Sequence, residues 1–130
     1  MNARQLLLVL ASVFGSSPLN AALAQETKGQ YVQVAEIEID PGGLEAYKIA
    51  VQEQIEAAIR DEPGVLVLYA VAQRDDPTRV KVFEVYRDMD AYRAHLQSPH
   101  FKKYKARTEN MVRSLKLIQQ TPIMLGAKPR

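Results

Sequence analysis

The chain has 130 residues, balances 17 Lys and Arg against 15 Asp and Glu, and contains no cysteine. This near-neutral balance gives no basic stripe for nucleic acid and no acidic tail. The lack of cysteine excludes disulfides, thiolate metal ligands and a thiol nucleophile. A chain of this length is expected to form one ordinary domain, for which self-association is a natural source of extra stability.

The first 24 residues have the pattern of a secretory signal peptide. Arg4 forms the positive n-region, residues 6–14 form a short apolar core, and Ala22-Leu23-Ala24 is a small-x-small cleavage site. The apolar run is too short to span a bilayer comfortably, although an uncleaved N-terminal anchor is the alternative. We therefore expect cleavage after Ala24, a periplasmic or secreted protein, and no membrane span after cleavage.

The next segment predicts a strand followed by a helix. Residues 25–30 are polar and predict a flexible leader, and residues 31–39 alternate between apolar and polar faces as a strand does. The sequence DPGG at residues 40–43 predicts a turn that supplies a helix cap. Apolar side chains then recur at helical spacing until Pro63-Gly64, which ends the helix.

The second half of the chain predicts three strands and two helices. In chain order these are a strand at 65–73, a hairpin turn at 74–78, a strand at 80–86, helices at 88–96 and from 99 to about 115, and a strand at 117–124. The strand at 65–73 is apolar on both faces, as expected for a strand that is covered on both sides. Pro122 interrupts the last strand, which suits an edge strand or a bulge.

The order strand, helix, strand, strand, helix, strand predicts an α+β domain at residues 31–121, followed by a C-terminal tail at 122–130. It is the ferredoxin-like split βαβ arrangement, in which helices cover one face of an antiparallel sheet. Because the strands at 65–73 and 80–86 are apolar on both faces, the other face of the sheet should be buried as well. The expected cover is the sheet of a second copy, related by a two-fold axis.

The two histidines, His95 and His100, lie on either side of a Ser98-Pro99 break. Two metal ligands on one helix face need a spacing of three or four residues, whereas these are five apart. Ser98 is a good helix cap and Pro99 suits a first helical position, so the break separates two helices. The spacing therefore predicts no metal site and no histidine pair. His95 is either a catalytic residue or a core histidine, and His100 is expected to be structural.

Glu84 lies within the apolar stretch VKVFEVY. A carboxylate in a covered strand costs several kcal/mol unless it is paired or protonated. Glu84 therefore either orients an imidazole, binds a ligand hydroxyl, or forms a salt bridge between subunits. The candidate partners for such a bridge are Arg79, Lys81 and Arg87. Three aromatic residues are candidates either for the walls of a substrate pocket or for plain core: Tyr69, Tyr86 and Phe101.

Four motifs between residues 62 and 104 occur together in one known family. They are Glu62-Pro63-Gly64 before the second strand, Glu84-Val85-Tyr86 in the third, an acidic helix start at 88–90, and AHLQSPHF at 94–101. Through these motifs the segment closely resembles the antibiotic biosynthesis monooxygenase family, especially its small quinol monooxygenase members. A weaker resemblance extends over residues 31–121.

The resemblance implies a dimeric α+β barrel, in which the sheet of each protomer packs on that of its mate. It also implies oxidation of a small quinol or polyphenol by dioxygen, through a substrate anion and without a metal, flavin or haem cofactor. His95 is then the candidate catalytic base and Glu84 its orienting partner, while Tyr69, Tyr86 and Phe101 form pocket walls. Two alternatives stay open: a non-catalytic dimer that binds a small aromatic or quinone, and an isomerase of a small carbonyl compound.

Overall fold

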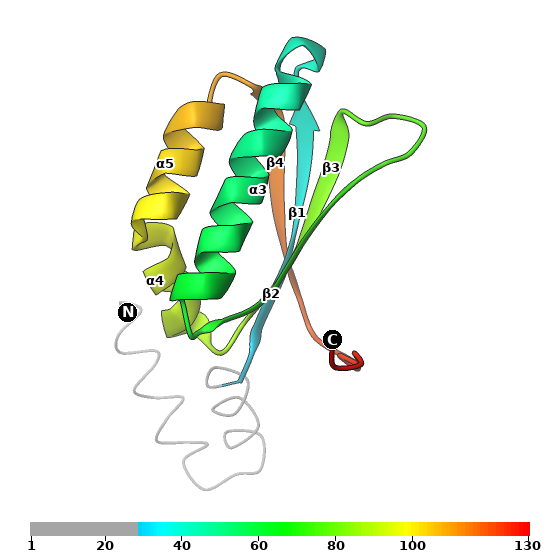
Figure 1. The fold of residues 1–130 in the computed structure, drawn as a ribbon. Helices are drawn as coiled ribbons and strands as arrows, with labels where there is room; N and C mark the ends of the chain where they lie inside the picture. The colour runs from blue at the N-terminus through cyan, green and yellow to red at the C-terminus, as the bar shows by residue number, and fades with distance from the viewer. Residues whose placement is uncertain (1–28) are drawn as a thin grey trace, which may run out of the picture.

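The computed structural model describes residues 29–130, so the predicted signal peptide at 1–24 lies outside the described residues. The elements are β1 (Tyr31–Ile39), the short 3-10 helix η1 (Pro41–Gly43), α3 (Leu44–Asp61), β2 (Val65–Ala72), β3 (Arg79–Tyr86), α4 (Met89–Gln97), α5 (Pro99–Thr108) and β4 (Val112–Gln120). The three α-helices lie on one side of the sheet (Figure 1). The predicted α+β fold with an antiparallel, ferredoxin-like sheet is confirmed.

The sheet has the strand order β2-β3-β1-β4, and every neighbouring pair is antiparallel. Gln33 of β1 stands opposite Glu84 of β3, and Leu68 of β2 stands opposite the same glutamate. Because opposite residues in an antiparallel pair point to the same face, this row places two polar side chains and one apolar side chain under the helices.

The last helix and strand differ from the sequence-based prediction. Helix α5 ends at Thr108 rather than near Leu115, and β4 begins at Val112 rather than Leu117. Apolar residues in this stretch fit helical spacing as well as strand spacing, so periodicity alone does not separate the two. The segment forms a strand because it pairs with β1 along nearly its whole length. Pro122 lies beyond the end of β4 and does not interrupt it.

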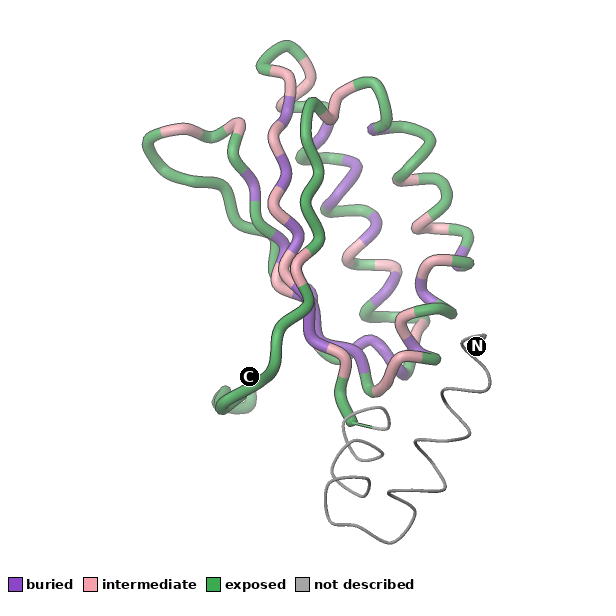
Figure 2. Tube along the Cα trace, turned by 180° about the vertical axis from the view of Figure 1, so that it is seen from behind, coloured by how far each residue is buried: buried purple, intermediate pink, exposed green. Residues whose placement is uncertain are grey.

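The two faces of the sheet differ in their cover. Figure 2 shows the buried positions gathered along the strands and along the sides of the helices that face them. On the face without helices, Tyr69 and Val71 of β2 are 49% and 59% exposed. Cover of this face by a second copy remains a prediction. In the region that the structure describes, no helix combines the length and the apolar character needed to cross a membrane.

Gly64 occupies a position at the end of α3 where the chain passes close to α4. A Cβ at Gly64 would lie 2.5 Å from the Cβ of Ala91, which is too close for two carbon atoms. We expect Gly64→Ala to lower the free energy of unfolding by about 1–3 kcal/mol, because the backbone must shift to relieve the overlap. Urea unfolding measures this change.

Gly126→Ala is the matched control, because a Cβ at Gly126 would meet nothing within 4 Å. Its urea midpoint should equal that of the wild type. Equal midpoints for both variants would contradict the close contact at Gly64.

Candidate functional site

A cavity of about 270 Å³ lies between the helices and the sheet. Its polar wall residues include Gln33 of β1, Gln54 of α3, Glu84 of β3 and His95 of α4. Its apolar walls include Val51, Ile55, Leu68, Val82, Phe101, Leu115 and Leu117. An apolar hollow with a few convergent polar groups is the usual form of a small-molecule site.

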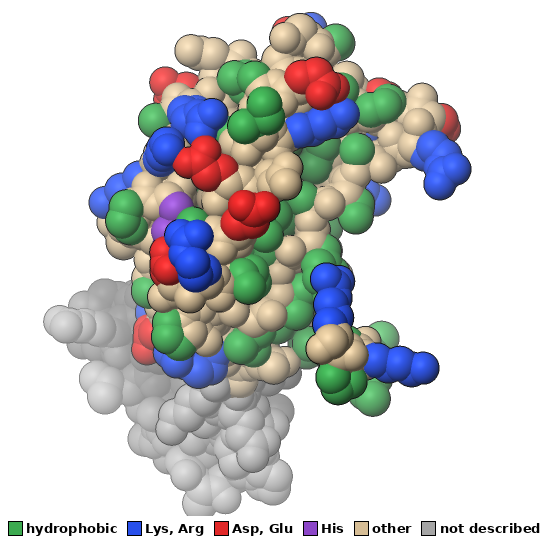
Figure 3. Space-filling model, in the orientation of Figure 1, with side chains coloured by type: hydrophobic (Ala, Val, Ile, Leu, Met, Phe, Trp, Pro, Cys, Tyr) green, Lys and Arg blue, Asp and Glu red, His purple; other side chains and the backbone are tan. Residues whose placement is uncertain are grey.

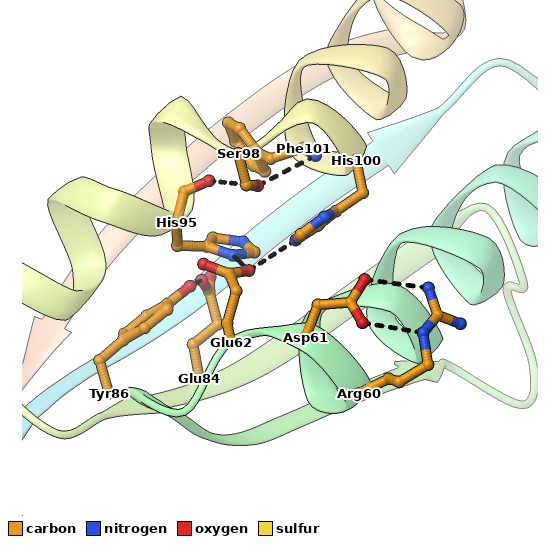
Figure 4. Close-up of polar contacts among 9 residues, drawn as sticks. All are labelled: Arg60, Asp61, Glu62, Glu84, Tyr86, His95, Ser98, His100 and Phe101. Atoms are coloured by element: carbon orange, nitrogen blue, oxygen red, sulfur yellow. Dashed lines mark hydrogen bonds and ion pairs between the residues drawn. The ribbon is translucent and has the colours of Figure 1, made fainter.

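Glu62 brings the two histidines together (Figure 4). His95 Nδ1 lies 2.7 Å from Glu62 Oε2, and His100 Nε2 lies 2.6 Å from the same oxygen. The spacing of the histidines predicts separate roles, but that rule holds for one continuous helix. Here His95 is in the last turn of α4 and His100 in the first turn of α5, so the break turns both rings toward one carboxylate.

Ser98 fixes the break between α4 and α5. Its hydroxyl donates to the carbonyl oxygen of His95 at 2.7 Å and accepts from the N–H of Phe101 at 3.3 Å. Pro99 follows at the start of α5, where no backbone donor is needed. The Ser-Pro sequence therefore sets the relative direction of the two helices, and with it the approach of both histidines to Glu62.

The ring of His95 is held on several sides. Its side chain is 2% exposed, and its ring centroid lies 5.4 Å from that of Tyr86 and 5.0 Å from that of Phe101. A carboxylate accepts hydrogen bonds, so Nδ1 carries the proton of the neutral ring and donates it to Glu62. In that tautomer Nε2 has the lone pair, and no described residue makes a hydrogen bond to it. When the ring is neutral, its accepting nitrogen is therefore not used by the described part of the chain.

Glu84 belongs to a second hydrogen-bonded group beside the cavity. Its carboxyl group accepts from Gln33 Nε2 at 3.2 Å and from the Tyr86 hydroxyl at 2.5 Å. Tyr31 donates to the amide oxygen of Gln33 at 3.1 Å. Burial, with the nearby charge of Glu84, raises the pKa of Tyr86. The phenol of Tyr86 therefore stays protonated and acts as a donor to Glu84.

Among the described residues, Glu84 forms no ion pair with the three cations considered for it, and a salt bridge between subunits stays a prediction. Arg79 pairs with Asp76, and Arg87 pairs with Asp88. Glu84 shares the helix-covered face of β3 with neighbours two residues away, whereas Arg79 and Lys81 lie on the other face of the strand. Within this chain the hydrogen-bond partners of Glu84 are the neutral amide of Gln33 and the phenol of Tyr86.

The five residues predicted as site residues fall in three places. His95, Glu84 and Phe101 line the cavity. Tyr86 is fully buried behind the cavity wall, and its hydroxyl donates a hydrogen bond to Glu84, which lines the cavity. Tyr69 lies on the opposite face of the sheet and lines a separate groove between α3 and β2. Because β2 is apolar on both faces, its sequence did not indicate which face would border the cavity.

Two polar residues of the site were missed by the reasoning from sequence. Glu62 is the orienting partner of His95, and Glu84 makes no hydrogen bond to that ring among the described residues. The signal for Glu62 was its place in the Glu-Pro-Gly motif. Gln54 is buried on α3, and its Oε1 is the one buried side-chain polar atom in the described range without a hydrogen-bond partner. As for metal ligands, the described residues offer a single group, formed by Glu62, His95 and His100.

Comparisons with known proteins agree with this fold. The sequence model of the antibiotic biosynthesis monooxygenase family matches residues 30–107. A crystal structure described as a "putative antibiotic biosynthesis monooxygenase" from Bacteroides thetaiotaomicron VPI-5482 is 46% identical, covers 80% of this chain and 99% of its own, and has a TM-score of 0.75.

Two more distant structures carry the same description, and they support the fold alone. One, from Nitrosomonas europaea, is 24% identical over 74% of this chain and 92% of its own, with a TM-score of 0.69. The other, from Caulobacter crescentus CB15, is 19% identical over 80% of this chain and 99% of its own, with a TM-score of 0.72. No curated protein matches the chain.

Proposed function

Because this chain belongs to the antibiotic biosynthesis monooxygenase family, we propose that it oxidises a small quinol or polyphenol with dioxygen, and that His95 removes the substrate proton. One observation carries the proposal. The ring of His95 borders the cavity while its Nδ1 is held by Glu62, which leaves Nε2 as the accepting nitrogen. A base within reach of a bound hydroxyl is what deprotonation of a quinol requires.

The proposed reaction draws its electrons from the substrate. Nε2 of His95 takes a hydroxyl proton, and the resulting anion passes one electron to dioxygen. The two radicals combine to form a carbon–oxygen bond, and the peroxide then loses water. The sum is one quinol plus one dioxygen giving one hydroxylated quinone plus one water. One oxygen atom of dioxygen enters the product, and no metal, flavin or haem is needed as an electron source.

Glu62 acts in this scheme as a positioning residue. Its negative carboxylate holds the ring in the required tautomer and stabilises the imidazolium that forms once His95 has taken the proton. Of the parts considered for Glu84, we assign it the binding of a ligand hydroxyl rather than the orientation of His95. Its position at the cavity and its hydrogen bonds to Gln33 and Tyr86 rather than to His95 support a role in binding a second hydroxyl of the substrate.

The size of the cavity favours a small substrate. Its volume of about 270 Å³ is just below the range of roughly 300–1,000 Å³ that is usual for ligand pockets. The apolar walls also strengthen the charge interactions of His95 and Glu62 during proton transfer once a bound substrate has displaced water. A compact aromatic diol fits a cavity of this size, whereas a quinol with a long side chain would not fit inside it completely.

Oxygen consumption tests the proposal. Purified protein added to reduced menadione, or to one member of a panel of small hydroquinones, should raise the rate of oxygen uptake above that of autoxidation. An unchanged rate across the whole panel would count against oxidation. If ligands raise the melting temperature without turnover, the non-catalytic binding protein is favoured. Substrate loss without oxygen uptake favours the isomerase.

We also propose that two copies associate through the sheet face that carries no helices. Exposed apolar side chains such as Tyr69 and Val71 form an apolar surface there that a second copy could bury. Light scattering should give the mass of a dimer. Tyr69→Lys should shift the mass toward a monomer, whereas Ile49→Lys, at an exposed position on α3, should leave the dimer intact. A wild-type monomer at micromolar concentration would refute this assembly.

Export of the chain is a further proposal, based on the sequence of residues 1–24. The mature protein should begin at Gln25 and be found in the periplasm or outside the cell. The intact mass of the protein recovered from those fractions decides this point. A mass that includes Met1 to Ala24 would contradict cleavage.

A further inference from the structure

Three atoms of ligand type converge beside the cavity: Glu62 Oε2, His95 Nδ1 and His100 Nε2, all within 4.8 Å of one another. We propose that they bind one divalent transition-metal ion such as Zn²⁺, and that the bound ion blocks the action of His95 as a base. Two imidazole nitrogens and one carboxylate oxygen are a common ligand set for such ions. A solvent molecule would complete the coordination.

The ligand atoms need only small movements to accept an ion. In the structure the two nitrogens lie 2.7 and 2.6 Å from the shared oxygen, which are hydrogen-bond distances. Metal bonds of about 2.0–2.1 Å in a tetrahedral site separate the ligand atoms by about 3.3 Å. Each oxygen–nitrogen separation must therefore widen by about 0.6–0.7 Å, and the two nitrogens, which lie within 4.8 Å of each other, must approach by at most about 1.5 Å. Rotation of the Glu62 side chain can supply part of this movement, because Glu62 is the C-cap of α3 and its backbone is extended rather than helical.

The elements that carry the three ligands are held by other contacts. Glu62 follows the last turn of α3, while the Ser98 hydrogen bonds fix the ends of α4 and α5 that bear the histidines. The side chains of Glu62, His95 and His100 are 16%, 2% and 14% exposed. Such ligands lose little freedom and little hydration when an ion binds, which favours affinity.

An ion can reach the cluster without passing through the cavity. His100 also lines a groove of about 280 Å³ between α3 and α5, and histidine atoms are visible on the helical side in Figure 3. The cations of that groove are already paired: Arg60 with Asp61, and both Lys103 and Arg107 with Glu53. Figure 4 shows Asp61 turned toward Arg60 and away from the cluster. The positive charges that line this groove are therefore neutralised by carboxylates, and they repel an incoming metal ion only weakly.

Metal binding changes the tautomer of His95. An ion bound at Nδ1 takes the place of the proton there, so the neutral ring must carry its proton on Nε2. Nε2 then donates a hydrogen bond and no longer accepts a proton from the substrate. This inhibitory effect rests on the proposed function, whereas the binding of the ion does not.

Titration of metal-free protein with Co²⁺ and Zn²⁺ tests the binding. Visible absorption of Co²⁺ reports the ligand geometry, and competition with a coloured chelator gives the Zn²⁺ affinity. We expect one ion per chain, with binding at least about tenfold to a hundredfold weaker in Glu62→Gln and His100→Ala. His100→Gln is the second variant if His100→Ala fails to fold. The control is Asp61→Asn, a neighbouring exposed carboxylate, whose affinity should equal that of the wild type.

The outcomes separate the two claims. No binding by the wild type, or equal affinity in the ligand variants and in Asp61→Asn, would overturn the metal site. A wild type that binds one Zn²⁺ yet oxidises quinol at an unchanged or higher rate would overturn the inhibition alone. Because binding is measured without substrate, it can succeed or fail independently of quinol oxidation.

Discussion

His95→Ala is expected to lower kcat/KM for oxygen-dependent quinol oxidation by about 10²–10⁴-fold, because the cavity loses the group that takes the substrate proton. Initial rates of oxygen uptake, corrected for autoxidation, give the change. The ring of His95 is buried against Tyr86 and Phe101, so its removal also leaves a void. Folding of the variant must therefore be checked by its melting temperature.

His95→Gln is the companion variant to His95→Ala. The amide fills more of the space and can still donate to Glu62, but it has no basic nitrogen. It should fold like the wild type and lose activity to a similar extent. If both folded variants retain the wild-type rate, His95 is not the base.

Glu62→Gln is expected to reduce kcat by about 10–100-fold with little change in KM. The amide oxygen can still accept from Nδ1 of His95, so the neutral ring keeps its position in the ground state. It lacks the negative charge that stabilises the imidazolium, and a hydrogen bond to a charged group contributes about 1.5–3 kcal/mol. The split between kcat and KM separates this role from general loss of binding.

Asp61→Asn is the matched control for Glu62→Gln. It removes the adjacent carboxylate, which is exposed and pairs with Arg60 rather than with a histidine. Its kcat should stay close to that of the wild type. A rise in KM alone in Glu62→Gln, or an equal loss of kcat in both variants, would contradict the positioning role.

The segment AHLQSPHF shows how a local sequence rule produces the site. A serine that caps a helix and a proline at its first position place a break between His95 and His100. The break was predictable from those two residues. Its effect on the rings was not, because the direction of each side chain depends on how α4 and α5 pack against α3. Spacing along the chain therefore argued against the pair that the tertiary structure brings to Glu62.

The sheet was largely predictable from alternation. Alternation marked β1, and the apolar stretch VKVFEVY marked β3, where Glu84 and Tyr86 lie two residues apart on one face. Alternation could not assign Tyr69 of β2 to a face, because both faces of that strand are apolar. It also failed at β4, where the pairing with β1 is a contact distant in sequence and local spacing suits either structure.

The isotopic fate of dioxygen tests the central claim most directly. The protein would be supplied with a reduced quinol under ¹⁸O₂, and the quinone product would be analysed by mass spectrometry. The proposed reaction predicts one ¹⁸O atom in each product molecule, at a rate that depends on His95. Unlabelled quinone formed with hydrogen peroxide, or labelled product formed equally fast without the protein, would contradict monooxygenation at this site.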